Sequence, residues 1–505
     1  MTDHSIVLPF VSHLFLGILL LLFWKKSNIQ RIISVLGNII VVAISVNLFQ
    51  KIWDGGILTM QAGNWPAPFG ITMVADIFSA TMIFLCSLAG VAVSIYSTAG
   101  ISELRQRYGY FPILHFLLMG LNGAFLTGDI FNLYVWFEIV IISSFVLMTL
   151  GGKKPQIEGA INYVTMNLLA SAIFLTAIAI LYGLTGSLNM ADLSTKIPHI
   201  RNQGLAHITA LLFFVAFGIK SAVFPLYFWL PSSYHTPPSA IAAIFGGLLT
   251  KVGIYALLRS FTLIFIPSPF IIQVLTSVAI FTLITGAVGA FIQRDIRKMF
   301  SYLIVCHIGY MVSGLALYTE VALAGTLFYM IHDIVVKTNL FLVSGLINKI
   351  RGSMNMREIG GLLRDYPRLS ILMLVVFFSL CGIPPLSGFW PKILLIKSSF
   401  TTGSFLLLGA LIAASFFTLV IITRMWAAVF WKNTPPENMQ RDRFQEMSLL
   451  RKSMLVGPVV LLAITSLYIG IGADNIFAVS NRIASELLNT STYVNTVLGT
   501  FPEEP

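Results

Sequence analysis

The segment LLFFVAFGIKSAVFPLYFWLP, residues 211–231, is an apolar run interrupted by Lys220 and Pro225. It has the length that a helix needs to cross a bilayer, about 20 residues. A lysine at the centre of such a helix costs about 2.5–3.5 kcal/mol on insertion scales, so it needs a partner or water. A proline removes a backbone donor, and a break at membrane depth is tolerated where it lines a polar cavity. The segment therefore predicts a broken membrane helix that carries an ionisable group.

Apolar runs of this kind recur along all 505 residues, of which 57% are hydrophobic and 10% are charged. Soluble proteins carry roughly 25% charged residues, because their surface faces water. We therefore expect an all-α polytopic membrane protein of about 14 transmembrane helices. The predicted helices cover 5–24, 31–49, 71–96, 110–127, 129–150, 159–184, 205–230, 238–258, 272–292, 299–317, 320–348, 368–400, 404–431 and 452–473.

Basic residues are concentrated on alternate loops of this prediction. The rich set contains Lys25, Lys26, Arg31, Arg105, Arg107, Lys153, Lys154, Arg294, Arg297, Lys298, Lys349, Arg351, Arg357, Arg364, Arg368, Lys432, Arg441, Arg443, Arg451 and Lys452. The opposite set contains only Lys51, Lys196, Arg201, Arg259 and Arg482. The positive-inside rule places the rich set in the cytoplasm and both termini on the outer side. Orientation therefore accounts for the net charge of +11 without a nucleic-acid partner.

The remaining basic residues fall inside predicted helices. They are Lys220, Lys251, Lys337, Lys392, Lys397 and Arg424. The last two are near helix ends, where long side chains can reach the interface. The other four are deeper, as is Glu138, which is in the middle of its helix. We hypothesise that Glu138 pairs with Lys220, and that a change in this pairing lets Lys220 pass its proton to the next site.

Further polar residues accompany these lysines. Asp333 and Lys337 are four residues apart, which is the spacing of an ion pair on one helix face. His307 and His332 can be relay groups or hydrogen-bonded core residues. Possible auxiliary groups near outer helix ends are Asp76 and Asp129. Cys86, Cys306 and Cys381 lack metal-ligand spacing and predict neither a metal site nor a disulfide framework.

Two segments of the chain resemble each other, PLYFWLP at 225–231 and PLSGFWP at 385–391. Near each segment a buried lysine lies within about two turns of a proline break. Pro225 follows Lys220, whereas Pro384 and Pro385 precede Lys392. Interrupted helices in corresponding halves indicate the ion path of a transporter, although a proline can also simply kink a packed helix. We predict two inverted five-helix repeats whose third helices, the seventh and twelfth of the chain, are broken. The predicted regions are 1–109 with three helices, 110–258 and 272–431 as the repeats, and 432–505 with a loop, the last helix and a tail.

The motif KSAVFPLYFWLP, followed by GGLLTKVGIYALL, resembles the antiporter-like subunits shared by respiratory complex I and Mrp-type cation/proton antiporters. The resemblance covers nearly the whole chain and includes NLYVWFE, SYLIVCHIGYM, HDIVVKTNLFLVSG and LSGFWPK. It implies a proton relay through Glu138, Lys220, Lys251, His332, Lys337 and Lys392.

Within this superfamily, YHTPPSAIAAIFGGLLTK is most similar to the Mrp-type multisubunit sodium/proton antiporters. Complex I relatives usually carry a histidine where Tyr227 stands, and one complex I subunit carries a glutamate where Lys392 stands. The resemblance implies transport of H⁺ and Na⁺ with no redox cofactor. It also implies a hetero-oligomer with Mrp subunits A, B, C, E, F and G in a prokaryotic plasma membrane.

The main alternative is a proton-pumping subunit of a complex I-like NADH:quinone oxidoreductase or a membrane-bound hydrogenase. Such a pump would use the same lysines and differ in what drives them. A solute symporter should show one central site, whereas these ionisable residues are spread over five predicted helices. A membrane enzyme should show a nucleophile–base pair near an interface, and the sequence indicates none.

Overall fold

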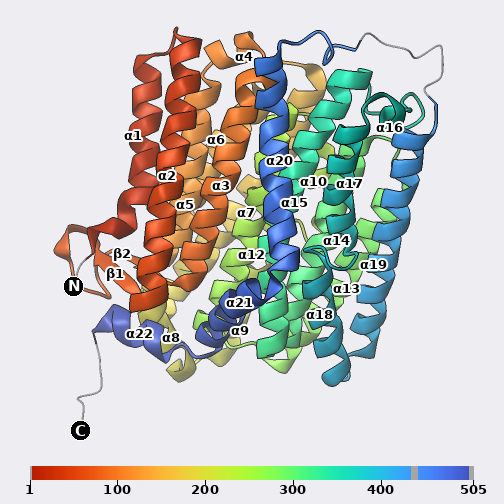
Figure 1. Cartoon of the computed structure of the whole chain (residues 1–505). Coiled ribbons are helices and arrows are strands. Elements are labelled where there is room, and N and C mark those ends of the chain that lie inside the picture. Colours follow the sequence, from red (N-terminus) through yellow and green to blue (C-terminus); the bar gives the residue numbers. More distant parts are fainter. Residues whose placement is uncertain (1–2, 434–441, 500–505) are drawn as a thin grey trace.

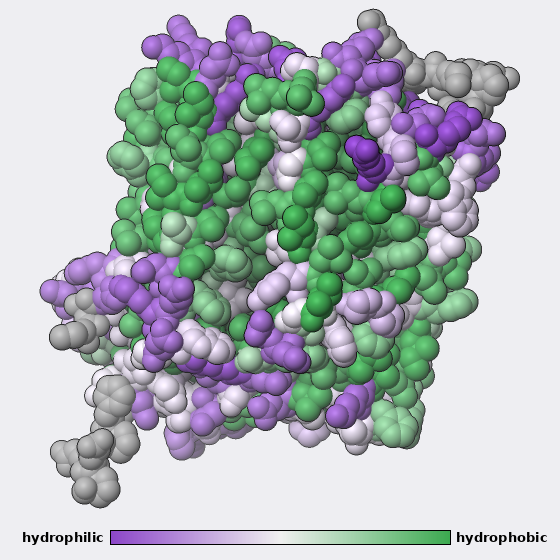
Figure 2. All heavy atoms as spheres, viewed as in Figure 1, coloured by the Kyte–Doolittle hydropathy of each residue, from purple (hydrophilic) through white to green (hydrophobic). Residues whose placement is uncertain are grey.

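The computed structural model describes residues 3–433 and 442–499 as a bundle of long, roughly parallel helices (Figure 1). Arg441, one of the predicted loop cations, lies outside the described residues. In Figure 2 an apolar belt crosses the middle of the molecule, and hydrophilic residues gather at its two ends. Large side chains such as Phe416 and Leu406 are 63% and 77% exposed. Exposed apolar surface on this scale is what a lipid-facing surface requires.

The bounds of the elements are as follows. The first region has η1 (His4–Val7), α1 (Leu8–Leu22), α2 (Ser27–Gly55), β1 (Leu58–Gln61), η2 (Ala62–Asn64), β2 (Thr72–Ala75), α3 (Ile77–Gly100) and α4 (Glu103–Arg107). Next come α5 (Tyr110–Leu126), α6 (Ile130–Thr149), α7 (Lys154–Thr185), α8 (Met190–Lys196), η3 (Ile197–His199), α9 (Gln203–Ser221), α10 (Trp229–Ser233), α11 (Ser239–Ile244), η4 (Phe245–Leu249), α12 (Thr250–Arg259) and η5 (Ser260–Ile264). They are followed by α13 (Pro269–Ile292), α14 (Ile296–Leu317), α15 (Glu320–Arg351), α16 (Leu362–Asp365), α17 (Pro367–Cys381), α18 (Phe389–Thr401), α19 (Phe405–Trp426) and η6 (Ala427–Trp431). The chain ends with α20 (Leu449–Ile471), α21 (Ala473–Leu488) and α22 (Ser491–Leu498).

Among the described residues, 12 helices are long and apolar enough to span a membrane. Two shorter apolar helices, α5 and α17, accompany them. The polytopic all-helical class is confirmed, and the total of about 14 spans stays a prediction. The central helix is α15, whose most apolar window is completely buried within the protein, as is that of the segment Ser239–Ile264. Both are therefore shielded from lipid and can carry polar groups.

The seventh and twelfth predicted helices are broken, as expected. The helix α9 ends at Ser221, where Ala222 adopts a left-handed conformation with φ 60°, and α10 resumes at Trp229. The helix α17 ends at Cys381 before Gly382, which has φ 79°, and α18 begins at Phe389. Proline at 225 lacks the N–H that would bond to the carbonyl four residues earlier, so the helix cannot continue past Ser221.

The two halves of the bundle share a distinctive backbone pairing. Asp129 forms an antiparallel bridge with Asn189, and Asp295 forms one with Asn355. In each case the aspartate caps the helix that follows, α6 or α14. Each half also closes with a π-helical turn, η5 or η6. By these features α6 in the first half corresponds to α14 in the second, and α7 corresponds to α15.

The two bridges lie at opposite ends of the bundle. The Asp129 bridge is beside β2, since the Gly128 amide donates to the carbonyl of Thr72, 2.9 Å away. The partner of Asp295, Asn355, lies between α15 and α16, and Figure 1 places α16 at the other end from β2. We call the end with α4 and α16 the basic face and the end with β1, β2, α8 and α22 the opposite face. This arrangement supports the inverted repeats, whose exact boundaries stay predictions.

Candidate functional site

Three helices bring Lys251, Asp333 and His307 together in the middle of the bundle. Lys251 Nζ lies 2.7 Å from Asp333 Oδ2, and His307 Nδ1 lies 3.0 Å from Asp333 Oδ1. All three side chains are completely buried. The two oxygens of one carboxylate therefore hold a cation from α12 and an imidazole from α14.

Two glycines position Lys251 for this contact. Gly246 and Gly247 belong to the π-turn η4, which packs directly against α15. A β-carbon at Gly247 would overlap Thr338 Oγ1, and one at Gly246 would lie 2.6 Å from the Phe341 ring. Only glycine permits this close approach. The carbonyl of Gly246 also accepts a 2.7 Å hydrogen bond from Lys251 Nζ.

Asp333 and Lys337 have the spacing of an ion pair on α15, but the structure pairs Asp333 with Lys251 and His307 instead. Lys337 is completely buried, and its Nζ has no hydrogen-bond partner among the residues that the structure describes. The spacing of four residues permits such a pair but does not select it. The Asp333 oxygens instead contact Lys251 of α12 and His307 of α14. Lys337 remains near enough to Asp333, Lys251 and Lys392 to interact with them electrostatically.

The second helix break positions Lys392. Its Nζ donates to the carbonyls of Cys381 and Leu380 at 2.7 and 3.4 Å. These carbonyls end α17, where a helix has unsatisfied acceptors and a partial negative charge. Lys392 Nζ also lies 5.6 Å from the ring centre of Tyr310. The break thus supplies the partners that a buried ammonium needs.

His332 connects the broken segment with two other helices. Its Nδ1 is hydrogen-bonded to Ser387 Oγ at 2.8 Å. Ser387 Oγ in turn lies 2.9 Å from Ser466 Oγ, which donates to Ser379 Oγ at 3.0 Å. The ring of Tyr329 stands between the two histidines, 5.5 Å from His307 and 5.6 Å from His332 between ring centres. Polar groups therefore continue from Asp333 towards Lys392.

Lys220 occupies a separate polar position between α6, α7 and α9. Its Nζ donates to Ser171 Oγ at 3.3 Å and lies 4.7 Å from the ring centre of Phe137. Beside it is a cavity with about 20 Å³ of space for water centres, lined also by Tyr163 and Tyr234. That space holds about one water molecule.

Glu138 does not form the direct pair with Lys220 that the sequence predicts. Among the described residues Glu138 has no ion pair within 4.0 Å, and its Oε1 is buried without a hydrogen-bond partner. The Phe137 ring and Ser171 occupy the positions closest to the Lys220 amine. Glu138 and Lys220 interact electrostatically across this gap.

The predicted auxiliary aspartates are at helix N-termini, away from the central row. Asp129 accepts a hydrogen bond from the amide of Asn132 and caps α6. Asp76 forms a capping box with Ser79 and pairs with Arg259, at 2.6 Å. The placement of Arg259 in a loop is therefore wrong, because it ends α12 and its side chain is only 7% exposed.

Sequence reasoning missed several polar groups. Tyr234 lines the cavity beside Lys220, and its buried hydroxyl has no hydrogen-bond partner among the described residues. Its place in the YHTPP motif is the signal that could have indicated it. A second group lies between α1, α2 and α5, where His13 Nδ1 and His115 Nδ1 are 3.0 Å apart. Only the presence of histidine in an apolar run could have indicated that pair.

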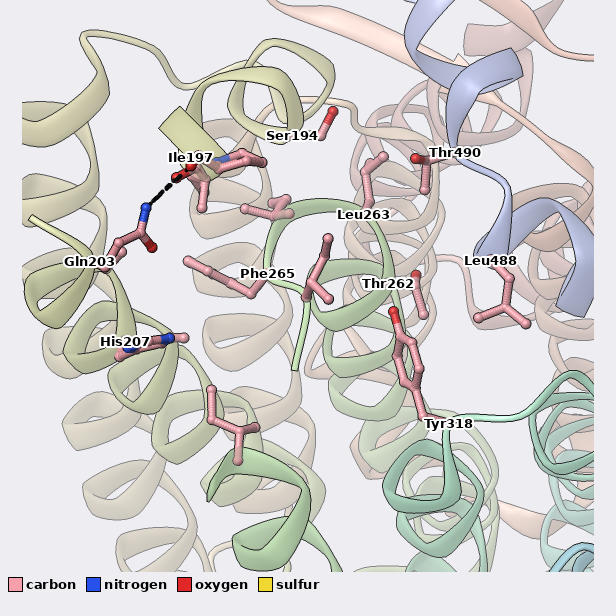
Figure 3. Close-up of a pocket in the computed structure, with 16 residues that line it drawn as sticks. Ser194, Ile197, Gln203, His207, Thr262, Leu263, Phe265, Tyr318, Leu488 and Thr490 are labelled. Atoms are coloured by element: carbon pink, nitrogen blue, oxygen red, sulfur yellow. Dashed lines mark hydrogen bonds between the residues drawn. The ribbon is translucent and has the colours of Figure 1, made fainter. Parts of the chain in front are cut away.

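A larger cavity lies apart from the central row. Figure 3 shows its lining residues Gln203, His207 and Tyr318, together with Leu488 and Thr490. Its volume is about 370 Å³, and none of its lining residues is Lys, Arg, Asp or Glu. Among the residues that the structure describes, no three His, Cys, Asp or Glu side chains are placed to hold a metal ion.

The central row places titratable groups close enough together to exchange protons between neighbours. Lys251, His307, Asp333, Lys337 and Lys392 come from four helices and are all buried. Buried charges on this scale persist only where they pair or meet water, and in membrane proteins they mark ion pathways.

The chain is similar to known membrane proteins over nearly its whole length. The family model for the transmembrane part of NADH:quinone oxidoreductase and Mrp antiporter subunits matches residues 127–418. The D subunit of the Na(+)/H(+) antiporter of Alkalihalophilus pseudofirmus is 39% identical over 98% of this chain and 99% of that protein. The Na(+)/H(+) antiporter D subunit of Bacillus subtilis is 37% identical over 98% of this chain and 99% of that protein.

A solved structure extends the comparison to three dimensions. A chain in the structure of the Mrp complex from Dietzia sp. DQ12-45-1b superposes with a TM-score of 0.90 at 27% identity, covering 99% of this chain and all of that one. The chain belongs to the NADH:quinone oxidoreductase/Mrp antiporter family of membrane subunits and, within it, to the Na⁺/H⁺ antiporter D subunits.

Proposed function

We propose that this chain is the proton-translocating subunit of a multisubunit Na⁺/H⁺ antiporter, and thus part of a secondary transporter rather than an enzyme. The observation that carries the proposal is the buried row that begins with the Lys251–Asp333–His307 contact and extends to Lys392. Removing these charges from water has a large cost that a purely structural role would not justify.

The mechanism follows from how these charges affect one another. The Asp333 carboxylate pairs with the Lys251 ammonium at 2.7 Å, and Lys337 lies close enough to both Lys251 and Lys392 to respond to their charges. A proton that arrives at one lysine therefore favours release from the next. Lys220 and Tyr234 line the adjoining cavity, whose wall also includes Leu249 and Val252 beside Lys251 in sequence, and they would supply protons to Lys251 from there. Glu138 would act on this step through its charge, which interacts with Lys220.

Partners, location and transported ions belong to the same proposal. The similar proteins described above are named as subunits, and the superposed chain comes from a Mrp complex. We therefore infer assembly with Mrp subunits A, B, C, E, F and G in a prokaryotic plasma membrane. The transported ions are H⁺ and Na⁺, the chain works without a cofactor, and both termini are on the outer side.

The test uses the whole complex in inside-out vesicles without NADH or quinone. Na⁺-dependent pH change should be present in the wild type and reduced at least about tenfold in Lys220→Ala and Lys251→Ala. Lys397→Ala is the matched control, since Lys397 is an exposed lysine of α18 close to Lys392 in sequence.

Full exchange in both buried-lysine variants would refute the relay. Exchange that requires NADH or quinone in the wild type would instead indicate the redox-driven pump.

A further inference from the structure

A second charged site lies at the basic face, outside the central row. A cavity of about 300 Å³ opens there between α3, α4, α7, α14 and α15. Its lining residues include Arg105, Lys153, Arg297, Lys349 and Arg443. None of the lining residues that the structure describes is Asp or Glu. The cavity therefore presents several cations without a balancing carboxylate.

Backbone contacts fix the guanidinium groups at this cavity. Arg105 Nε donates to the carbonyl of Leu150 at 2.9 Å, and Arg297 Nη1 donates to the carbonyl of Pro237 at 3.0 Å. Neither contact neutralises the charge. Asp295, two residues before Arg297, caps α14 by accepting from the amide of Lys298 and interacts with Arg297 only through its charge, without a direct contact.

Two buried donors in the same cavity have no partner. Arg297 Nε is buried and makes no hydrogen bond within the described residues. Tyr96 is 1% exposed, and its hydroxyl is likewise without a partner there. A buried donor left unsatisfied costs about 1–3 kcal/mol, so these groups favour a bound acceptor.

We propose that this cavity binds a phosphate group, which offers negative charge and several acceptor oxygens at once. Arginine forks suit phosphate geometry, and basic pockets between membrane helices bind anionic head groups. Either an anionic phospholipid or free phosphate can present this group. The basic face is generally rich in Lys and Arg. That excess alone does not explain why five basic residues line one cavity in which two buried donors lack partners.

The test compares two probes on the whole purified complex. Phosphatidylglycerol binding is measured by native mass spectrometry after delipidation, and inorganic phosphate binding by calorimetry in phosphatidylcholine nanodiscs. The double variant Lys153→Gln/Lys349→Gln removes two cavity cations. Lys154→Gln is the matched control, because the Lys154 side chain is adjacent in sequence, 88% exposed and outside the cavity lining.

We expect at least one probe to bind the wild type and the control equally, and the double variant about tenfold more weakly. Weakening for phosphatidylglycerol alone identifies a lipid head group, and weakening for inorganic phosphate identifies a soluble anion. Tyr96→Phe should also weaken the same probe without removing charge. Equal binding by the double variant and the wild type, or equal loss in Lys154→Gln, would overturn the proposal.

Discussion

Asp333 is the carboxylate that joins two of the central groups. It contacts both Lys251 and His307, at 2.7 and 3.0 Å, and all three are shielded from solvent. Removing one partner of a buried ion pair typically costs 3–5 kcal/mol, because the remaining charge is left uncompensated. We predict that Asp333→Asn lowers thermal stability by about this amount and abolishes Na⁺-dependent proton exchange, measured on the complex in vesicles.

The variant Asp333→Glu tests whether the carboxylate charge alone accounts for the loss of stability. It keeps the carboxylate, so stability should be largely restored while exchange recovers only in part, since a longer side chain misplaces both contacts. Glu320→Gln, at the exposed start of the same helix, is the control and should leave both properties unchanged. Wild-type exchange in Asp333→Asn would contradict a role in the relay.

The hydroxyl of Tyr234 provides a second test of the relay. It lines the cavity beside Lys220 and makes no hydrogen bond to the described residues. Tyr234→Phe should therefore leave the melting temperature unchanged but slow proton exchange several-fold, because a hydroxyl next to a water can pass a proton.

Tyr163→Phe provides the contrast on the same cavity. Its hydroxyl lies 2.6 Å from Ser144 Oγ, so its loss should cost about 1 kcal/mol of stability. If Tyr234→Phe lowers stability like Tyr163→Phe and exchanges protons at the wild-type rate, the Tyr234 hydroxyl serves only packing.

The sequence identified the ionisable residues of the row but not their contacts. Lys220, Lys251 and Lys392 stand out because charge is costly in an apolar run, whereas His332 was indicated only by the family resemblance. The partner of Asp333 depends on how η4 packs against α15, which local spacing does not encode. Tyr234 was missed because an uncharged tyrosine in an apolar segment lacks the burial cost that makes a charged residue conspicuous.

At the scale of elements, the two helix breaks end in the same backbone conformation. Ala222 and Gly382 both have positive φ, 60° and 79°, directly after α9 and α17. Left-handed backbone costs a non-glycine residue roughly 1–2 kcal/mol. Ala222→Gly should therefore be tolerated and raise stability by about 1 kcal/mol, measured by thermal unfolding of the purified complex.

The reverse change at the second break should be harmful. A β-carbon at Gly382 would lie 3.0 Å from the carbonyl oxygen of Gly388 and 3.1 Å from Lys392 Cδ. Gly382→Ala should lower stability by about 1–2 kcal/mol and, by displacing Lys392, reduce proton exchange. Equal effects of Ala222→Gly and Gly382→Ala would show that the two breaks do not depend on this conformation.

Hydrophobic runs and prolines predicted most elements, because both act locally. The runs located the long helices, and Pro225 and Pro384–Pro385 located the breaks. The π-turns η4, η5 and η6 were not predicted, since their cause is packing between helices. Arg259 was placed in a loop for the same reason, as its partner Asp76 is distant in sequence.

For the whole molecule, orientation is the property that the charge distribution predicts and the fold alone does not fix. The basic face carries the turn at Lys153 and Lys154, and the opposite face carries β1, β2 and α22. If the basic face is cytoplasmic, Lys154→Cys should react with a membrane-impermeant maleimide only in inside-out vesicles. Arg201→Cys, exposed between η3 and α9, should react only in right-side-out vesicles.

The native cysteines make this experiment direct. Cys86, Cys306 and Cys381 are free and buried, so the wild type should give little labelling in either preparation. It serves as the control without removal of any cysteine. If Lys154→Cys is labelled from the outside and Arg201→Cys from the inside, the orientation of the protein in the membrane is the reverse of the one predicted. The proposed phosphate cavity would then face outward and could bind only a lipid of the outer leaflet or an external anion.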